Sequence, residues 1–546
     1  MSVAVFTFNC SEPDEKIDPD DPDNNPEEQQ MNQTFHVQMG ASGQVLWNVA
    51  DNVNVWNYSS WTPLEQAPAD HFRNSLPFVK YVQLMTAAGG SPERDLLISP
   101  SDKTVSDDYN FTPLIRACRN LRRQGLTPHL KLGNVPWKYS SNPRTAGYGV
   151  NVCPPDDYAK WHAYIKALAT SLVDEFGLAE VGTWRFGCVT EYENRAWFSV
   201  NDNPALTRDA YFKLYDYTVN ALQQALGDDV CIGAHSMTCS EGLWDEREFI
   251  AHCARGTNYC TGQKGTRVCF LSSSFYEESP GKPVTGDHTF PESISILRNK
   301  AETEGLNDLF YGVDEGRILN GLDGKPLEPR AVGYTWQAAF DARLYRMAYD
   351  HQVDYFSHWN YTTGDVVPGG IPSVSAQTSG FFSRLAGAIR LTVQPEMDEP
   401  FEENGETAAV AAWNREQNRV YLLFYAYSNS IQGKGSLNIA CRLDGIEKSG
   451  NVAATRTLIS DHSNFFDDWL ADWGKYGISK GDFGSWSADG FVINSSLLPA
   501  ERVAHYRSCA ALSPKAETLT VKNGTLNIET SIPVHGVLLY EIELLR

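Results

Sequence analysis

From about residue 78 to residue 358 the chain alternates between short apolar runs and amphipathic stretches. Phe78–Met85 has the composition of a buried strand, and residues 114–123 place apolar side chains at helical spacing before Gly125. Counting a first strand near residues 52–57, the pattern predicts eight strand–helix units. Strands that alternate with helices at this spacing are parallel, and eight units are the number in a (β/α)8 TIM barrel.

The expected strands after the first lie at 78–85, 129–133, 183–189, 229–234, 267–275, 308–313 and 352–358, and the expected helices at 114–123, 157–177, 208–226, 245–255, 291–303 and 331–349. An open, doubly wound sheet is the alternative α/β fold. It is disfavoured because no glycine-rich dinucleotide-binding turn follows the first strand.

The pattern changes after about residue 392, where short apolar strands alternate with turn residues. This is typical of antiparallel sheets, and we expect an accessory β-sandwich at 393–546 beside a barrel at 51–392. Two short stretches within 32–50, residues 34–38 and 43–48, are also strand-like. We expect them to join the β-sandwich, which would then contain both ends of the chain.

The first 31 residues differ from the rest. Residues 3–10 are mostly apolar and end in Cys10, and residues 11–30 hold nine acidic residues, one lysine and four prolines. This resembles the end of a truncated bacterial lipoprotein signal followed by a disordered, acidic tether. It implies a lipidated Cys10, outer-membrane anchoring and export to the periplasm or cell surface. A frayed terminus with a free thiol is the alternative.

Composition narrows the classes of partner. The net charge of −23 opposes binding to a phosphate backbone, so a nucleic-acid partner is excluded as the main function. Aromatic residues make up 12% of the chain, which suits either a large core or ligands with faces that stack, such as sugars. No run approaches 18 uninterrupted apolar residues, so the sequence predicts no membrane-spanning helix.

The chain has eleven cysteines, five of them between residues 231 and 269. Their spacing contains no C-x2-C pair, so the sequence predicts no zinc site there. Cys188 and Cys231 lie in apolar runs and are expected to be small buried side chains. The sequence allows a disulfide between two of Cys239, Cys253 and Cys260 but does not assign the pair.

Two carboxylates directly follow apolar runs. Glu191 ends the expected fourth strand and Glu315 the expected seventh. In a TIM barrel the reactive groups gather at the carboxyl ends of the strands, and two opposed carboxylates are the minimum machinery for glycoside hydrolysis. A helix-capping role is the alternative for each residue, and Glu193 is a rival for the role of Glu191.

Residues 158–194 resemble glycoside hydrolase family 39, the family of β-xylosidases and α-L-iduronidases. Phe176-Gly177, Glu180-Val181, Trp184 and Phe186 fall in register with its motif and place Glu191 at the acid/base position. The resemblance implies a retaining glycosidase with Glu315 as nucleophile and with neither metal nor cofactor. It also implies carboxyl groups about 5–5.5 Å apart.

The chain departs from the family pattern at two positions. Thr190 stands where the family has an asparagine, and Gln83 where it has an arginine on the second strand. We therefore expect an altered sugar-binding shell and a missing positive charge near the nucleophile. These changes also motivate a rival hypothesis, a carbohydrate-binding surface protein whose barrel has lost catalysis.

The remaining candidates for substrate binding follow other strands. They are Asn134, Trp137, His235, Tyr276, His358 and Trp359, of which Tyr276 resembles the family tyrosine that bonds the nucleophile. A structural role is the alternative for each of them, above all for His235. We expect an exo-acting enzyme on side chains of plant or algal polysaccharide, with an α-L-arabinofuranoside or β-D-xyloside linkage.

Overall fold

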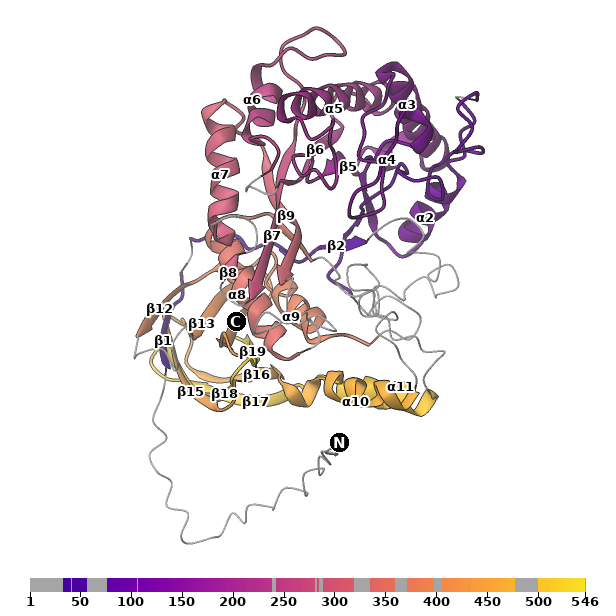
Figure 1. Cartoon of the computed structure of the whole chain (residues 1–546). Helices are drawn as coiled ribbons and strands as arrows, with labels where there is room; N and C mark the ends of the chain where they lie inside the picture. Colours follow the sequence, from indigo (N-terminus) through magenta and orange to yellow (C-terminus); the bar gives the residue numbers. More distant parts are fainter. Residues whose placement is uncertain are drawn as a thin grey trace.

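The computed structural model describes most of the chain from residue 33 to residue 545. The described residues are 33–40, 42–55, 76–105, 107–237, 242–279, 282–283, 288–318, 334–358, 371–396, 405–431, 433–476 and 499–545. A barrel with its surrounding helices forms one part, and two antiparallel sheets form the other (Figure 1). The lipoprotein-like segment 1–31 and Cys10 lie outside the described residues, so lipid anchoring stays a prediction.

Eight parallel strands close into a barrel, which confirms the predicted fold. They are β2 (Asn52–Val55), β3 (Tyr81–Leu84), β4 (Thr127–Lys131), β5 (Arg185–Thr190), β6 (Cys231–Met237), β7 (Phe270–Ser279), β9 (Phe310–Ile318) and β10 (Tyr355–His358). Each pairs with the next in chain order, β7 pairs with β9, and β10 returns to β2. The two-residue strand β8 (Lys282–Pro283) pairs only with β7.

The crossover helices begin and end where the sequence provides capping residues. Asp157 caps the start of α3 (Tyr158–Phe176) by accepting a hydrogen bond from the backbone of Ala159. Gly177, with a φ of 82°, ends it, because glycine adopts this left-handed conformation without steric cost. The others are α2 (Thr112–Arg123), α4 (Leu178–Val181), α5 (Pro204–Leu226), α6 (Arg247–Arg255), α7 (Phe290–Thr303), α8 (Trp336–Asp350) and α9 (Val374–Ser383).

The accessory part is a sandwich of two sheets. One has the order β11-β13-β14-β19-β16-β17 and the other β12-β1-β15-β18. The strands are β1 (Gln33–Gln38), β11 (Ile389–Arg390), β12 (Thr392–Glu396), β13 (Glu406–Asn414), β14 (Arg419–Tyr427), β15 (Ser436–Asp444), β16 (Gly450–Ile459), β17 (Lys515–Val521), β18 (Thr525–Pro533) and β19 (Val537–Glu543). Because β1 lies between β12 and β15, the sandwich contains both ends of the described chain.

Two expectations for this part need correction. Residues 43–48 form no strand, because only Val45 makes a bridge, to Ile389. Two helices, α10 (Phe466–Tyr476) and α11 (Ala500–Cys509), interrupt the all-β pattern and pack against each other. Their sequences are rich in charged residues, and the antiparallel alternation on either side obscured them.

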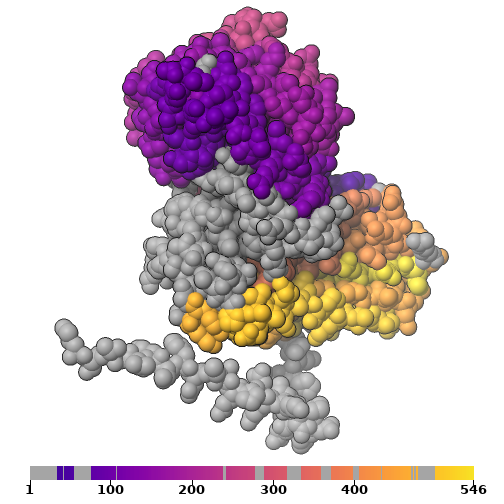
Figure 2. Space-filling model, turned by 90° about the vertical axis from the view of Figure 1, so that its right-hand side faces the viewer, coloured from indigo at the N-terminus to yellow at the C-terminus, as the bar shows by residue number. Residues whose placement is uncertain are grey.

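The barrel and the sandwich pack through α8. The indole of Trp336 donates a hydrogen bond to the carbonyl of Ser428, and the Arg346 guanidinium bonds Glu406 and the hydroxyl of Tyr425. Apolar residues of β13, β14 and β19 join the barrel core, while their other face packs on the four-stranded sheet. Figure 2 shows the barrel part, in indigo to magenta, above the orange and yellow sandwich.

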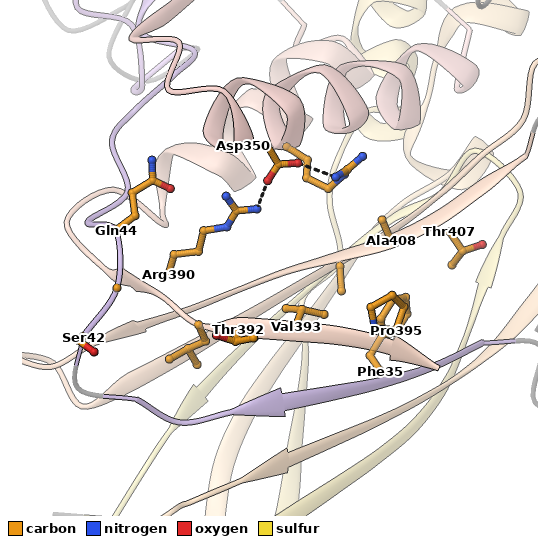
Figure 3. Close-up of a pocket in the computed structure, with 14 residues that line it drawn as sticks. Phe35, Ser42, Gln44, Asp350, Arg390, Thr392, Val393, Pro395, Thr407 and Ala408 are labelled. Carbon is orange, nitrogen blue, oxygen red and sulfur yellow. Dashed lines mark hydrogen bonds and ion pairs between the residues drawn. The ribbon is translucent and has the colours of Figure 1, made fainter. Parts of the chain in front are cut away.

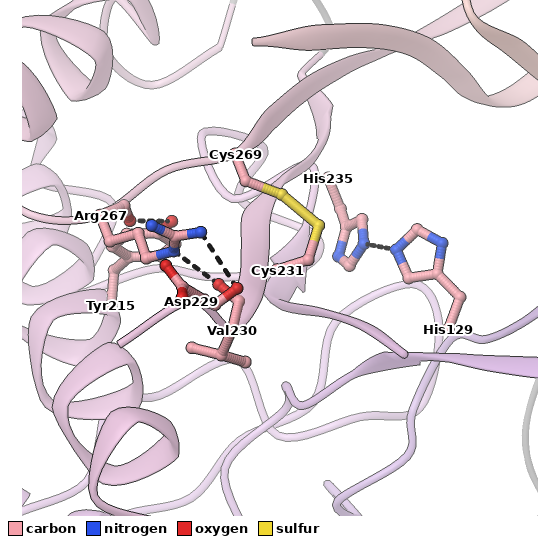
Figure 4. The surroundings of a disulfide bond; sticks show 8 residues. All are labelled: His129, Tyr215, Asp229, Val230, Cys231, His235, Arg267 and Cys269. Carbon is pink, nitrogen blue, oxygen red and sulfur yellow. Dashed lines mark hydrogen bonds between the residues drawn. A yellow bond between two sulfur atoms is a disulfide. The ribbon is translucent and has the colours of Figure 1, made fainter. Parts of the chain in front are cut away.

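The cysteines differ from the prediction. Cys231 is not a lone buried side chain, because it forms a disulfide with Cys269 at the start of the neighbouring strand (Figure 4). Cys253 and Cys260 are free, and Cys239 lies outside the described residues. Cys188 is buried as expected. Among the helices that the structure describes, none is long and apolar enough to cross a membrane.

Candidate active site

The structure places Glu191 and Glu315 together at the carboxyl ends of two barrel strands. Glu191 directly follows β5, the fourth barrel strand, and Glu315 lies on β9, the seventh. Both are almost fully buried, with 7% and 4% of the residue exposed. Glu191 has a φ of 41°, a left-handed conformation that costs a non-glycine residue about 1–3 kcal/mol and is characteristic of functional sites.

Each carboxylate has its own hydrogen-bond donors. The hydroxyl of Ser274 donates to Oε1 of Glu191 at 2.8 Å, and the Asn194 amide donates to Oε2 at 3.0 Å. Thr190 donates to Oε1 of Glu315 at 2.8 Å, and Tyr276 donates to Oε2 at 3.3 Å. The structure therefore brings Thr190 and Tyr276, two of the predicted site residues, into contact with Glu315.

The environments of the two carboxylates differ in charge. Burial, followed by repulsion from Glu315, raises the pKa of Glu191 to about 8, although the hydrogen bond from Ser274 opposes the rise. Glu315 instead has a cation beside it, the ammonium group of Lys131 at 3.5 Å. The raised pKa keeps Glu191 protonated at neutral pH, and a general acid needs this state.

Lys131 corrects one expectation from the sequence. Gln83 does occupy the arginine position, but the positive charge is not missing, because the neighbouring strand β4 supplies it through Lys131. Lys131 is fully buried and lies 3.7 Å from Oδ2 of Asp314. Gln83 donates to the other oxygen of Asp314 at 2.8 Å. A buried network therefore lies beside the nucleophile position.

Asp314 is the centre of this network. Ser272 and Tyr355 donate to its carboxylate at 2.6 Å each. Burial opposes ionisation, but the charge of Lys131 and these hydrogen bonds outweigh it and hold the pKa of Asp314 below its usual value. The group therefore stays ionised, and its charge fixes Lys131 beneath the two glutamates.

Tyr148 is an aromatic neighbour of the pair that the sequence analysis missed. Burial and then the charges of Glu191 and Glu315 raise its pKa to about 12, which places its phenol near both carboxylates. Its ring stacks on Trp197 with the centroids 4.4 Å apart and the planes at 17°. Stacked aromatic faces beside two carboxylates suit a sugar ring.

Three other predicted site residues, Asn134, Trp137 and His358, lie in the described part of the chain. Asn134 is buried after β4, and its amide donates to the carbonyl of Trp197 at 2.7 Å. Trp137 begins the short 3₁₀ helix η2 (Trp137–Tyr139), and its backbone N–H bonds Asp95. His358 is the last residue of β10, and Trp359 lies outside the described residues.

His235 has a structural role in the core of the barrel and does not face the candidate active site. Its ring lies inside the barrel, where Nε2 is 2.6 Å from Nε2 of His129 (Figure 4). Gly187 on β5 leaves the space for this ring, because a Cβ atom there would lie 2.1 Å from it. Burial lowers the pKa of both histidines well below the usual value. We therefore correct the expectation that His235 bonds the substrate.

Glu193, the rival of Glu191, is fully buried behind the site. Its side chain lies against Gly242, where an added Cβ atom would be 2.4 Å from Cγ of Glu193. Its charge contributes to the raised pKa of Glu191. Its position therefore favours Glu191 as the reacting group.

A cavity of about 470 Å³ lies away from these carboxylates, between α8 and the sandwich (Figure 3). Asp350 accepts hydrogen bonds there from Arg390 and Arg346. The lining residues include neither Glu191 nor Glu315. The cavity therefore belongs to the junction of the two parts and not to the candidate active site.

Two buried glutamates at the ends of the fourth and seventh strands of a TIM barrel are the arrangement of barrel glycosidases that use two carboxylates. The family model for glycosyl hydrolases family 39 matches residues 94–301, which include Glu191. This match covers less than half of the chain and gives its likeness to glycoside hydrolase family 39.

Curated proteins with known activities resemble parts of this chain. A β-xylosidase of Geobacillus stearothermophilus is 32% identical over 344 residues, 57% of this chain and 63% of the relative. An α-L-iduronidase of Mus musculus is 24% identical over 252 residues, 45% of this chain and 35% of the relative. The matched segments thus span less than two thirds of these relatives.

Solved structures share the fold over almost the whole chain. A monomeric β-xylosidase from Caulobacter crescentus superposes with a TM-score of 0.67 and 18% identity, over 94% of this chain and 100% of that structure. A family 39 enzyme from Xanthomonas axonopodis pv. citri superposes with a TM-score of 0.66 and 15% identity, over 95% and 98%. At these identities the likeness concerns the fold.

Proposed function

We propose that this protein is a retaining glycoside hydrolase in which Glu191 is the acid/base and Glu315 the nucleophile. The observation that supports this most directly is the difference between the two carboxyl groups, since Glu191 has a pKa of about 8 and Glu315 is paired with Lys131. In the first step Glu315 attacks the anomeric carbon while Glu191 protonates the leaving oxygen. In the second step Glu191 removes a proton from the water that releases the sugar.

The hydrogen bonds support this division of roles. Thr190 and Tyr276 donate to both oxygens of Glu315 and hold the carboxylate in place for attack. Ser274 and Asn194 do the same for Glu191, so that the acid and the nucleophile are each fixed before substrate binds. Such preorganised groups contribute to the rate because they need no rearrangement in the transition state.

For the substrate, we propose exo-action on a terminal β-D-xyloside or α-L-arabinofuranoside of a polysaccharide side chain. A β-xylosidase is among the curated relatives, which supports the xyloside. Thr190, shorter than asparagine, leaves more room beside the 2-hydroxyl, which favours the furanoside. Tyr148, partly exposed and stacked on the buried Trp197, offers an aromatic face to either ring.

A side-by-side assay of hydrolysis tests the proposal. The substrates are aryl β-D-xyloside, aryl α-L-arabinofuranoside, aryl β-D-glucuronide and oligosaccharides. We expect release of a monosaccharide with net retention at the anomeric carbon, followed by NMR, and loss of turnover in Glu315→Gln. Azide should restore turnover to Glu191→Ala by replacing the water, since a small anion needs no general base. Inversion, or cleavage only in the middle of long chains, would contradict the proposal.

The rival function, carbohydrate binding without catalysis, rested on the altered Thr190 and Gln83. The Lys131 ammonium beside Glu315 weakens that argument. The same assay separates the two functions, since a binding protein would show affinity for oligosaccharides without release of sugar.

We also propose that Cys10 is lipidated and anchors the protein at the cell surface. Labelling with a radioactive fatty acid, compared between the wild type and Cys10→Ser, tests this proposal.

A further inference from the structure

Three side chains of types that bind metals lie close together on the helices α10 and α11, outside the candidate active site. Figure 1 shows these two helices at the edge of the sandwich. Asp468 is in the first turn of α10, and His505 and Cys509 are on α11. Residues four apart on a helix lie on the same face, so His505 and Cys509 point the same way, toward Asp468. The three ligand atoms lie within 4.8 Å of one another.

The distances between these atoms resemble the edges of a zinc tetrahedron. Sγ of Cys509 lies 3.5 Å from Nε2 of His505 and 3.6 Å from Oδ2 of Asp468. With a Zn–S bond of about 2.3 Å and Zn–N and Zn–O bonds of about 2.0–2.1 Å, both edges from sulfur would be about 3.5 Å.

The third edge is shorter than in a metal site. Nε2 of His505 and Oδ2 of Asp468 are 2.6 Å apart, as a direct hydrogen bond requires, whereas a shared zinc ion would hold them about 3.3 Å apart. The two side chains are 42% and 48% exposed, so solvent and not packed neighbours surrounds much of each, and they can move apart by this amount. The arrangement therefore needs an opening of roughly 0.7 Å at one edge only.

We propose that Asp468, His505 and Cys509 bind one zinc ion, with water as the fourth ligand. Thiolate, imidazole and carboxylate are all ligands that zinc accepts, and a thiolate disfavours magnesium and calcium. The Cys509 thiol loses its proton to solvent when the metal binds, and His505 gives up its hydrogen bond to Asp468. The exposed side of the cluster leaves room for the water.

The ion would cross-link two helices that share a small core. This core consists of Ile371, Phe465, Phe466, Tyr506 and Ala510. Tyr506 and Arg502 of α11 also bond the carboxylate of Asp472 on α10 at 2.5 Å each. Because the ion would join α10 to α11 directly, we expect bound zinc to stabilise the accessory part without changing turnover at Glu191 and Glu315.

Titration of the reduced, metal-free full chain with Co²⁺ as a zinc probe tests the proposal. We expect one equivalent to bind per chain, with a thiolate-to-cobalt charge-transfer band that Zn²⁺ then removes. Cys509→Ser should abolish the band, whereas Cys153→Ser and Cys260→Ser, which change other partly exposed thiols, should keep it. His505→Gln and Asp468→Asn should each weaken binding by more than the 10–100-fold typical of an outer-shell partner.

Thermal melting gives a second readout. Zn²⁺ should raise the Tm of the wild type and of Cys153→Ser but not of Cys509→Ser. The proposal is wrong if no stoichiometric band forms, if the band persists in Cys509→Ser, or if His505→Gln and Asp468→Asn bind cobalt as tightly as the wild type. If Cys509→Ser fails to fold, the cobalt affinities of Asp468→Asn and His505→Gln still decide whether these side chains bind the metal.

Discussion

The ammonium group of Lys131 lies 3.5 Å from Oε1 of Glu315, and both side chains are buried inside the barrel. Lys131 is on β4, two residues beyond His129, which pairs with Gln83 on β3. Lys131 and Gln83 both reach Asp314, so a positive charge expected from the second strand comes instead from the third. The strand that supplies the charge has changed, but Glu315, the proposed nucleophile, still has a cation beside it.

Lys131→Met should therefore lower kcat by about 100-fold, because Glu315 loses the positive charge that orients its carboxylate. The same change leaves Asp314 buried without its cation and should destabilise the fold by roughly 3–5 kcal/mol. Steady-state kinetics and chemical denaturation measure the two effects.

Two double variants separate catalysis from folding. Lys131→Met combined with Asp314→Asn removes both charges, so stability should recover while kcat stays low. Gln83→Arg combined with Lys131→Met returns a cation from the second strand and should recover part of kcat. Full activity in Lys131→Met would show that this charge plays no part in the reaction.

The pH profile should report the acid/base. The pKa of Glu191, about 8, predicts that kcat/KM falls above about pH 8, because the ionised form cannot protonate the leaving group. The hydrogen bond from Ser274 favours the charged form of Glu191, so Ser274→Ala should move this alkaline limb to higher pH. Ser273→Ala, at the neighbouring buried serine, should leave it in place. An alkaline limb that moves down in Ser274→Ala would contradict the assignment.

Gly187→Ala should destabilise the protein by about 1–3 kcal/mol through overpacking. The added Cβ atom would lie 2.1 Å from the ring of His235, which is held against His129. Gly380→Ala is the matched control, because its Cβ atom would meet nothing closer than 3.9 Å on a helix. Denaturant unfolding measures both. Equal stability of the two variants would mean that His235 is not fixed in the core.

The sequence predicts the barrel and the two glutamates well because both depend on local pattern. Alternating apolar runs define the strands, and a carboxylate that directly follows a run must lie near the carboxyl end of that strand. The sequence alone therefore predicts Glu191 and Glu315 as residues at the carboxyl ends of their strands. The family resemblance added their roles, which the pattern alone does not supply.

The residues that the sequence analysis missed depend on contacts between distant segments. Lys131 stands in an apolar run, and a lysine there was a visible signal that it needs a buried anion, but only the structure identifies Asp314 as that anion. Cys231 begins β6 and Cys269 directly precedes the neighbouring strand β7, a relationship that a count of spacings does not test. Asp468 and Cys509 meet only because two helices interrupt a β-sandwich.

Thr190 offers the last test, because it links Lys131 to Glu315. The ammonium group donates to Oγ1 of Thr190 at 3.3 Å, and the Thr190 hydroxyl donates to Oε1 of Glu315 at 2.8 Å. Thr190→Val keeps the volume of the side chain and removes both hydrogen bonds. A hydrogen bond to a charged group contributes about 1.5–3 kcal/mol, so we expect kcat/KM to fall about 10–150-fold.

Thr190→Ser is the control, since serine keeps the hydroxyl and loses only a methyl group. It should retain kcat/KM within about 4-fold of the wild type, because the loss of one buried methyl group costs only about 0.8 kcal/mol. Thr190→Asn, which introduces the residue usual in the family, should shift the ratio of kcat/KM values toward the β-D-xyloside if the 2-hydroxyl contact is restored. Equal losses in Thr190→Ser and Thr190→Val would mean that the shape of the side chain, and not its hydroxyl, matters beside Glu315.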